Sequence, residues 1–181
     1  MVDIQDSMPP DPKKAEEQKE AAVKASLQKI KHKIIVMSGK GGVGKTSTAV
    51  NLSLALAEAG YKVGIMDVDL HGPDVPRMLG LDGMPELGPN QKLRPMTYSQ
   101  HLSAISIESF IPSKDDAIIW RGPMKFAAIR QFIGDVDWGD LDFLVIDSPP
   151  GTGDEPLTVA QIVSDARAVI VTTPQEVALA D

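Results

Sequence analysis

Cysteine is absent: none of the 181 residues of this sequence carries a thiol. Neither a disulfide bridge nor a thiolate-bound metal can therefore be built from this chain alone. The sequence also has no run of about 18 apolar residues, the length that a membrane-spanning helix needs. Its N-terminus shows no charged segment followed by an apolar core, the pattern of a secretory signal. These absences predict a cytoplasmic globular protein that does not bind membranes.

A surplus of basic residues is missing too. The chain has 18 Lys and Arg against 25 Asp and Glu, which gives a formal net charge of −7. Nucleic acids and anionic membrane surfaces are bound by basic faces, so this balance argues against either as the main partner. The remaining composition is ordinary for a globular protein, with 43% hydrophobic residues in a chain long enough for one domain with a substantial core.

The N-terminal part divides into two regions before the domain begins. Residues 1–11 are rich in proline and contain little that can be buried, which predicts a disordered leader. Residues 12–32 are rich in alanine and charged side chains and predict an N-terminal helix that begins at Pro12. Its narrow apolar stripe favours a helix that leans on the domain, with a partner-binding arm as the alternative. The stripe consists of Val23, Leu27, Ile30 and Ile34.

The next stretch, from Lys33 to Thr48, is an apolar strand that breaks into glycines and then enters a helix. Its spacing matches G-x-x-x-x-G-K-[ST], the pattern of a phosphate-binding loop. Glycines let the backbone curl so that successive N–H groups and the helix N-terminus converge on one anion. Lys45 is expected on the β- and γ-phosphates of a nucleotide, and the Thr46 hydroxyl on Mg²⁺. The nucleotide-binding residues expected in this loop are Gly39, Lys40, Gly41, Gly42, Val43, Gly44, Lys45, Thr46 and Ser47.

Strands and helices alternate along the rest of the chain. This order is that of a mainly parallel, doubly wound α/β sheet, and with the loop it predicts a P-loop NTPase fold. We expect further helices over residues 46–58 and 124–133, an apolar segment at 118–120 and a surface excursion over 84–98. The further strands are expected at 62–67, 102–107, 141–146 and 168–172.

One strand ends at Asp147, which is followed by a glycine- and proline-rich loop. This arrangement fits a Walker B carboxylate that accepts hydrogen bonds from Mg²⁺-bound water, with the Gly151 N–H free to meet a γ-phosphate. The alternatives are that Asp147 only caps its strand and that Thr152 and Glu155 only form a capping box.

Asp67 and Asp69 lie at the end of another predicted strand. Because the backbone can turn at the end of a strand, a spacing of two residues does not fix where each side chain points. Only one of the two carboxylates needs to touch the metal. The predicted metal-binding residues are thus Thr46, Asp147 and one of the two carboxylates Asp67 and Asp69. His71, beside the pair, is interpreted as a surface or packing residue, because phosphoryl transfer depends more on positioning and charge neutralisation than on a base.

The lysine at position 40 makes the loop Lys-Gly-Gly-Val-Gly-Lys-Thr, which resembles the deviant Walker A motif of the MinD/Mrp class of P-loop ATPases. In that class this lysine reaches across a dimer to the nucleotide of the partner subunit. Several stretches together resemble one family, the Mrp-type ATPases or nucleotide-binding-protein family, which are iron-sulfur cluster carriers. These stretches are residues 66–76, 120–124, 147–154 and 172–181. Small departures are His71, where a tyrosine is more usual, and Asp74, where a serine is.

The resemblance implies an enzyme that binds and hydrolyses Mg²⁺-ATP between the two subunits of a homodimer. Its implied catalytic residues are Lys40, Lys45 and Asp69, with Asp69 orienting the attacking water and Asp67 nearer the Mg²⁺ shell. The implied partners are iron-sulfur apoproteins or scaffold proteins, with neither nucleic acid nor membrane among them.

In the family, a C-x-x-C pair that would follow the last residue of this chain holds a [4Fe-4S] cluster between two subunits. We therefore expect residues 33–181 to be an ATPase domain that is incomplete at its C-terminus and has no cluster ligand. A spatial regulator like MinD or ParA is one alternative function, and a non-catalytic fragment is another.

Overall fold

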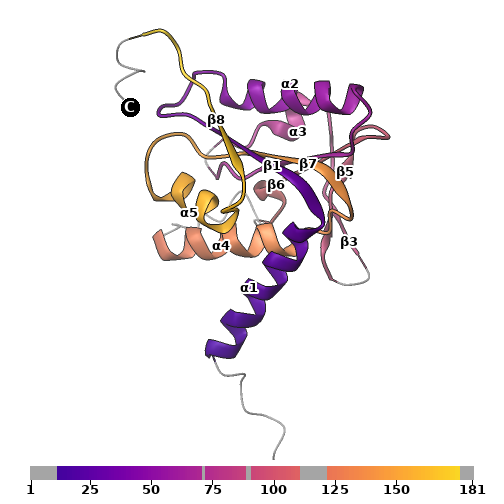
Figure 1. Cartoon of the computed structure of the whole chain (residues 1–181), viewed down its shortest axis with the longest axis vertical. Helices are drawn as coiled ribbons and strands as arrows, with labels where there is room; N and C mark the ends of the chain where they lie inside the picture. The colour runs from indigo at the N-terminus through magenta and orange to yellow at the C-terminus, as the bar shows by residue number, and fades with distance from the viewer. Residues whose placement is uncertain (1–11, 71, 89–90, 111–121, 176–181) are drawn as a thin grey trace, which may run out of the picture.

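The structure, a computed structural model, describes residues 12–70, 72–88, 91–110 and 122–175 (Figure 1). Its centre is a six-stranded sheet with the strand order β5-β6-β2-β7-β1-β8. All neighbouring strands run parallel except β5 and β6, which confirms the predicted doubly wound, mainly parallel sheet. The strands are β1 Ile30–Met37, β2 Val63–Asp67, β5 Met96–Thr97, β6 Leu102–Ser106, β7 Leu141–Asp147 and β8 Arg167–Ile170.

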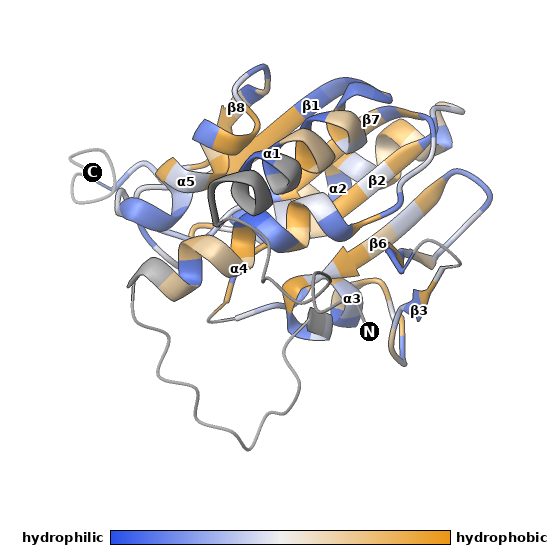
Figure 2. Cartoon of the chain, turned by 90° about the horizontal axis from the view of Figure 1, so that it is seen from below, coloured by the Kyte–Doolittle hydropathy of each residue, from blue (hydrophilic) through white to orange (hydrophobic). Residues whose placement is uncertain are grey.

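Helices cover both faces of this sheet (Figure 1). One face carries α2 (Lys45–Glu58) and the short α3 (Val75–Met78), and the other carries α4 (Gly122–Asp135) and α5 (Asp154–Ile162). In β7, Val145 joins the hydrophobic core beneath α2, whereas Leu144 and Ile146 join the core beneath α4 and α5. Because side chains alternate along a strand, the part of a strand that is buried on both faces is mainly apolar. Hydrophobic colours predominate in the central strands of Figure 2, although the first half of β1 carries Lys31, His32 and Lys33.

The N-terminal helix, α1, spans Pro12–Gln28, and β1 already begins at Ile30. The expected boundary between a helix to residue 32 and a strand from Lys33 was therefore too late. Val23 and Leu27 are buried in the core beside α4, but Ile30 opens β1 and Ile34 packs toward the α2 side. The four apolar residues predicted as one helical stripe thus belong to two elements: Val23 and Leu27 to α1, and Ile30 and Ile34 to β1.

α1 is fixed to the domain by close contact with α4. A Cβ atom added at Gly134 would lie 2.6 Å from the Val23 Cγ2 atom, so the two helices approach closely at this glycine. The Ser26 hydroxyl donates a hydrogen bond to the Val136 carbonyl oxygen at 3.0 Å. A helix that leans on the domain, as predicted, is what the structure shows.

The segment over residues 84–98 is more regular than the predicted surface excursion. It contains the antiparallel pair β3 (Glu86–Leu87) and β4 (Leu93–Arg94), followed by β5. Two-residue strands are too short to produce an alternating pattern in sequence, which explains why they were missed. After β6, Ile107 starts the 3₁₀ helix Ile107–Phe110 instead of extending the strand. The predicted leader at 1–11, His71 and the segment 118–120 lie outside the described residues.

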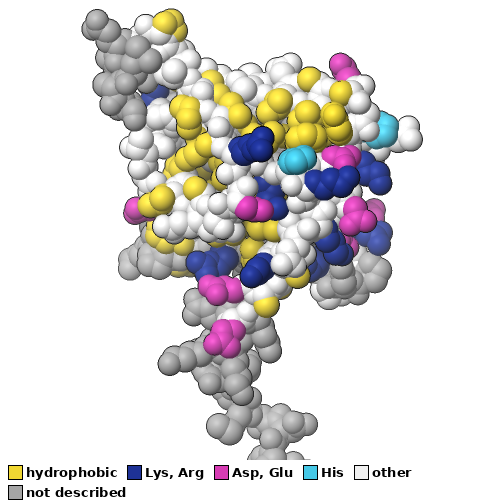
Figure 3. All heavy atoms as spheres, in the orientation of Figure 1, with side chains coloured by type: hydrophobic (Ala, Val, Ile, Leu, Met, Phe, Trp, Pro, Cys, Tyr) yellow, Lys and Arg dark blue, Asp and Glu magenta, His cyan; other side chains and the backbone are white. Residues whose placement is uncertain are grey.

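β8 forms one edge of the sheet and is mostly exposed; the Ile170 side chain is 65% accessible to solvent. Figure 3 shows hydrophobic side chains gathered on the upper half of this side of the molecule, with charged side chains mainly below. None of the described helices is both long enough and apolar enough to cross a membrane.

Candidate nucleotide-binding site

The candidate site lies where β1, β2 and β7 end together. In the register of the sheet, Asp147 of β7 stands beside Asp67 of β2 on one side and Val36 of β1 on the other. The loops that follow these three strands therefore meet at the carboxyl edge of the sheet, where open α/β sheets bind ligands.

The predicted phosphate-binding loop connects β1 to α2. Gly42 and Gly44 adopt φ values of +79° and +91°, which side-chain-bearing residues rarely tolerate, and Gly44 is the N-cap of α2. The first turn of a helix leaves backbone N–H groups without intrahelical partners, and these groups attract an anion. The nine predicted residues, Gly39 to Ser47, all lie in this loop or in the first turn of α2.

Beneath the loop, Lys45 and Asp147 form a buried ion pair. The Lys45 Nζ atom lies 2.6 Å from Asp147 Oδ1, and the two side chains are only 7% and 1% exposed. Burial raises the pKa of Asp147, while the Lys45 ammonium and the Thr46 hydroxyl act to lower it. The structure thus brings Lys45, Thr46 and Asp147 close together, with the lysine paired to the carboxylate.

The second oxygen of Asp147 provides a test for the predicted Mg²⁺ site. Asp147 Oδ2 is buried and accepts no hydrogen bond from the part of the chain that the structure describes. A carboxylate oxygen near a threonine hydroxyl offers the hard oxygen donors that Mg²⁺ prefers, so these residues fit the ion. Among the described residues, no group of three or more His, Cys, Asp or Glu gathers as a metal cluster. A Mg²⁺ ion here would therefore rely on few protein ligands, as is usual for this ion beside phosphates.

Asp67 is completely buried and is held differently from Asp147. Its two oxygens accept backbone N–H groups, from Asp69 at 3.0 Å and from Val75 at 3.1 Å. Burial raises the pKa of Asp67 to about 7, although the two N–H groups lower it. The carboxylate therefore organises the loop that follows β2.

Asp69 is 8% exposed and lies near enough to Asp147 for its charge to raise the pKa of that group. The turn after β2 thus brings both carboxylates of the pair to the site, although their spacing alone left their orientation open.

Two predicted site residues already make hydrogen bonds within the chain. The Gly151 N–H donates to the Ser38 carbonyl oxygen at 2.9 Å, so the expectation that it is free was wrong for this structure. The Lys40 ammonium donates to Gln175 Oε1 at 3.2 Å. Ser38 and Gln175 were not predicted as partners, because contacts between distant segments leave no signal in one sequence.

The alternative interpretation of Thr152 and Glu155 as a capping box was also wrong. Gly153 is the N-cap of α5, and it makes no side-chain capping hydrogen bond. Glu155 instead lies 2.6 Å from the Lys125 ammonium of α4, so its partner comes from another helix. Of the stretches that carried the family resemblance, residues 71, 120–121 and 176–181 lie outside the described residues.

Comparison with known proteins shows which family this chain resembles. The family described as "ParA: NUBPL iron-transfer P-loop NTPase" matches residues 29–181. The iron-sulfur cluster carrier protein of Methanococcus maripaludis is 49% identical over 172 residues, which are 94% of this chain and 60% of that protein. A cytosolic Fe-S cluster assembly factor NUBP2 homolog of Culex quinquefasciatus is 51% identical over 160 residues, 86% of this chain and 62% of that protein.

Solved structures give the same fold. The nucleotide-binding protein of Archaeoglobus fulgidus, in complex with ADP, is 40% identical with a TM-score of 0.75, and the match covers 89% of this chain and 62% of that one. The septum site-determining protein MinD of Pyrococcus horikoshii, complexed with Mg-ADP, is 26% identical with a TM-score of 0.56, covering 82% and 60%. The chain thus spans about 60% of the length of the curated relatives that it matches.

Proposed function

The chain belongs to the NUBPL iron-transfer family of P-loop NTPases, and from this membership we propose that it binds and hydrolyses ATP as the nucleotide-binding part of an iron-sulfur cluster carrier. The observation that carries the proposal is the buried pair of Lys45 and Asp147 beneath the glycine loop, at 2.6 Å. Burying two charges costs roughly several kcal/mol of stability. A phosphate-binding function would account for both charges at this position. The relatives named for cluster carriage or assembly are 49% and 51% identical to this chain, whereas MinD is 26% identical. We therefore propose cluster carriage and not spatial regulation.

In the proposed reaction Lys45 turns from Asp147 to the β- and γ-phosphates. Its positive charge there offsets the negative charge that develops as the bond between these two phosphates breaks. The backbone N–H groups of the glycine loop and of the first turn of α2 hold the remaining phosphate oxygens. Thr46 and Asp147 would hold Mg²⁺, which supplies charge neutralisation on the phosphates when bound.

Two roles within this proposal come from the family resemblance. Asp69 orients the attacking water, and Lys40 leaves Gln175 to reach the nucleotide of a second subunit in a homodimer. Mixing Lys40→Ala and Asp69→Asn chains tests the role of Lys40, because one composite site of a mixed dimer would be intact if this lysine acts across the interface. Recovery of phosphate release supports Lys40 acting across the dimer, and no recovery at any ratio contradicts it.

The cluster-carrying part of the function needs residues that this chain does not have. A protein-held [4Fe-4S] cluster is ligated mainly by cysteine thiolates, and the sequence contains none. We propose that the cluster and its transfer to apoproteins or scaffold proteins depend on the further length that the relatives possess. The cytoplasm is the proposed location, since one relative is named a cytosolic assembly factor.

Calorimetric titration with ATP, ADP and GTP, with and without Mg²⁺, tests nucleotide binding directly, and phosphate release tests hydrolysis. We expect ATP to bind with Mg²⁺ dependence, and the absence of any nucleotide binding would overturn the proposal. Anaerobic reconstitution of the same chain with iron and sulfide should leave no stoichiometric iron after desalting. A retained cluster would contradict the assignment of its ligands to the further length of the relatives.

A further inference from the structure

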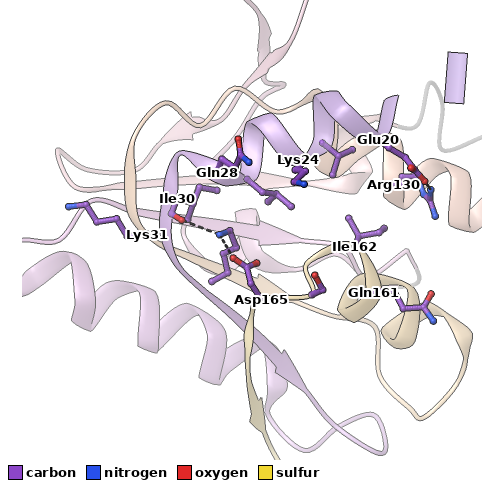
Figure 4. Close-up of a pocket in the computed structure, with 13 residues that line it drawn as sticks. Glu20, Lys24, Gln28, Ile30, Lys31, Arg130, Gln161, Ile162 and Asp165 are labelled. Carbon is purple, nitrogen blue, oxygen red and sulfur yellow. Dashed lines mark hydrogen bonds and ion pairs between the residues drawn. The ribbon is translucent and has the colours of Figure 1, made fainter. Parts of the chain in front are cut away.

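A groove of about 830 Å³ separates α1 from the C-terminal end of α5, at the opposite end of β1 from the phosphate-binding loop (Figure 4). Its volume lies in the range of known ligand sites, roughly 300 to 1,000 Å³. One wall is α1, from Glu20 to Gln28, and the opposite wall is formed by Gln161, Ile162 and the turn to Asp165. The floor includes the apolar side chains of Val23, Leu27 and Ile30.

The lining of this groove is positively charged although the chain is acidic. Four cations (Lys24, Lys31, Lys33 and Arg130) and two anions (Glu20 and Asp165) line it, a surplus of two positive charges. The formal charge of the whole chain is −7. An occupant of this groove should therefore carry negative charge.

The two anions of the lining are already engaged. Asp165 lies 2.8 Å from the ammonium of Lys33, whose side chain is only 6% exposed, and Glu20 lies 2.8 Å from Arg130 (Figure 4). Lys24 makes no ion pair with a described residue, and Lys31 pairs with Asp142, outside the groove. Lys24 on the α1 wall is thus the cation of the lining that has no ion pair among the described residues, and Lys31 at the end of the groove, although paired with Asp142, has a side chain that is 70% exposed.

The shape of the groove distinguishes between classes of occupant. Its cations come from α1, β1 and α4 and do not converge on one point, so they do not form a cage for a single small anion. A surplus of two charges on an acidic chain is also too small for a nucleic-acid backbone or an anionic bilayer. The α1 wall from Glu20 to Gln28 is about 12 Å long at 1.5 Å per residue, which is a little over two helical turns.

We propose that this groove docks an acidic amphipathic helix of a partner protein. Apolar side chains at positions i, i+3, i+4 and i+7 of such a helix would lie over Leu27 and Ile162, and flanking Asp or Glu side chains would face Lys24 and Lys31. This mode of recognition places one helix in the gap between two others and matches both the apolar floor and the positive rim. The inference does not require a bound nucleotide.

A fluorescein-labelled synthetic peptide of about 15 residues, with Leu at the helical anchor positions and Glu elsewhere, is the probe. Fluorescence anisotropy should show saturable binding that weakens as salt is added. Lys24→Glu should weaken it about tenfold, because it places like charges opposite each other. The control, Arg94→Glu, reverses the charge of an exposed side chain on β4, outside the groove, and should leave the affinity unchanged.

A second variant tests the location without changing charge. Ser164→Trp fills the groove from the α5 side and should also weaken binding of the peptide. Absence of saturable binding, equal weakening by Arg94→Glu, or equal binding of a peptide with Lys in place of Glu would each overturn the proposal. So would a concentration-dependent dimer in sedimentation that Ser164→Trp abolishes, since the occupant would then be a second copy. Lys45→Ala should retain the peptide, which separates this test from that of nucleotide binding.

Discussion

Glycine has opposite uses in two regions of this molecule. In the phosphate-binding loop, a Cβ atom added at Gly41, Gly42 or Gly44 would meet no other atom within 4 Å. At Gly64 in β2 and Gly134 in α4, an added Cβ would lie 2.5 Å from the Trp138 ring and 2.6 Å from Val23. The loop glycines keep space open beside the backbone, whereas the other two allow neighbouring elements to pack closely.

Two ion pairs also differ between the nucleotide-binding region and the rest of the molecule. The Lys45–Asp147 pair in the nucleotide-binding region is nearly inaccessible, at 7% and 1% exposure. The Lys31–Asp142 pair, near the start of β1 and β7, is 70% and 24% exposed. Exposed pairs are worth about 0 to 1 kcal/mol, whereas buried charges cost stability unless they are compensated. The carboxyl edge of the sheet is therefore organised for binding and the opposite part for packing, and variants in each region should have separable effects.

The largest effect is expected from Lys45→Ala in the binding region. Loss of a charge-assisted contact to the β- and γ-phosphates should lower ATP affinity at least a hundredfold, about 3 kcal/mol. Calorimetric titration measures the affinity, and circular dichroism shows whether the fold remains. Lys62→Ala, at an exposed lysine, is the control and should bind ATP normally. Wild-type affinity in Lys45→Ala would remove the assignment of the phosphate-binding loop.

Gly64→Ala in the packing region should have the opposite profile. The new methyl group would overlap the buried Trp138 ring and the Leu141 side chain, and we expect the free energy of unfolding to fall by about 3 kcal/mol. Urea denaturation measures this loss, and ATP affinity of the folded fraction should change little. Gly72→Ala is the matched control, because its Cβ would meet nothing within 4 Å. Equal stability of the two variants would show that the tryptophan moves aside at no cost.

The contrast between the glycines marks the limit of what the sequence predicts. The loop glycines were identified because spacing, the lysine and the flanking strand and helix are all local features. Gly64 in a buried strand carried no such signal, since its partner Trp138 is 74 residues away along the chain. The strand ends at Asp67 and Asp147 were likewise predictable, because long apolar runs define buried parallel strands.

Predictions failed where the outcome depended on contacts between elements. Glu155 had the spacing of a capping box with Thr152, but a lysine on α4 is its partner. The Gly151 N–H was expected to be free, but the carbonyl of Ser38 lies within hydrogen-bonding distance. Local patterns describe which bonds a residue can form, and tertiary packing decides which of them it does form.

A smaller effect is expected from Gly134→Ala, at the contact between α4 and α1. Alanine favours the helix by about 1 kcal/mol relative to glycine, but its Cβ would overlap Val23 Cγ2. We expect a net loss of about 1 kcal/mol in the free energy of unfolding, measured with urea. The double variant Gly134→Ala/Val23→Ala removes the overlap and should be more stable than Val23→Ala alone. If alanine at 134 destabilises both backgrounds equally, the close approach of the helices is not the cause.

The smallest effect should come from the exposed ion pair and should depend on pH. Hydrogen bonds from Lys31 and from the Lys62 backbone N–H hold the pKa of Asp142 below its usual range. A carboxylate with a lowered pKa in the folded state stabilises the protein fully above its unfolded pKa, about 4, and this contribution is lost as pH falls through the folded pKa. Asp142→Asn keeps an oxygen for the Lys62 N–H but removes the charge.

The stability advantage of the wild type over Asp142→Asn should therefore shrink as pH falls from about 6 to about 3. Urea denaturation at each pH measures it, with Asp140→Asn, a neighbouring exposed carboxylate, as the control. An advantage that stays constant or grows on acidification would show that the charge of Asp142 does not stabilise the fold, and the contrast between the two ion pairs would then rest on the buried pair alone.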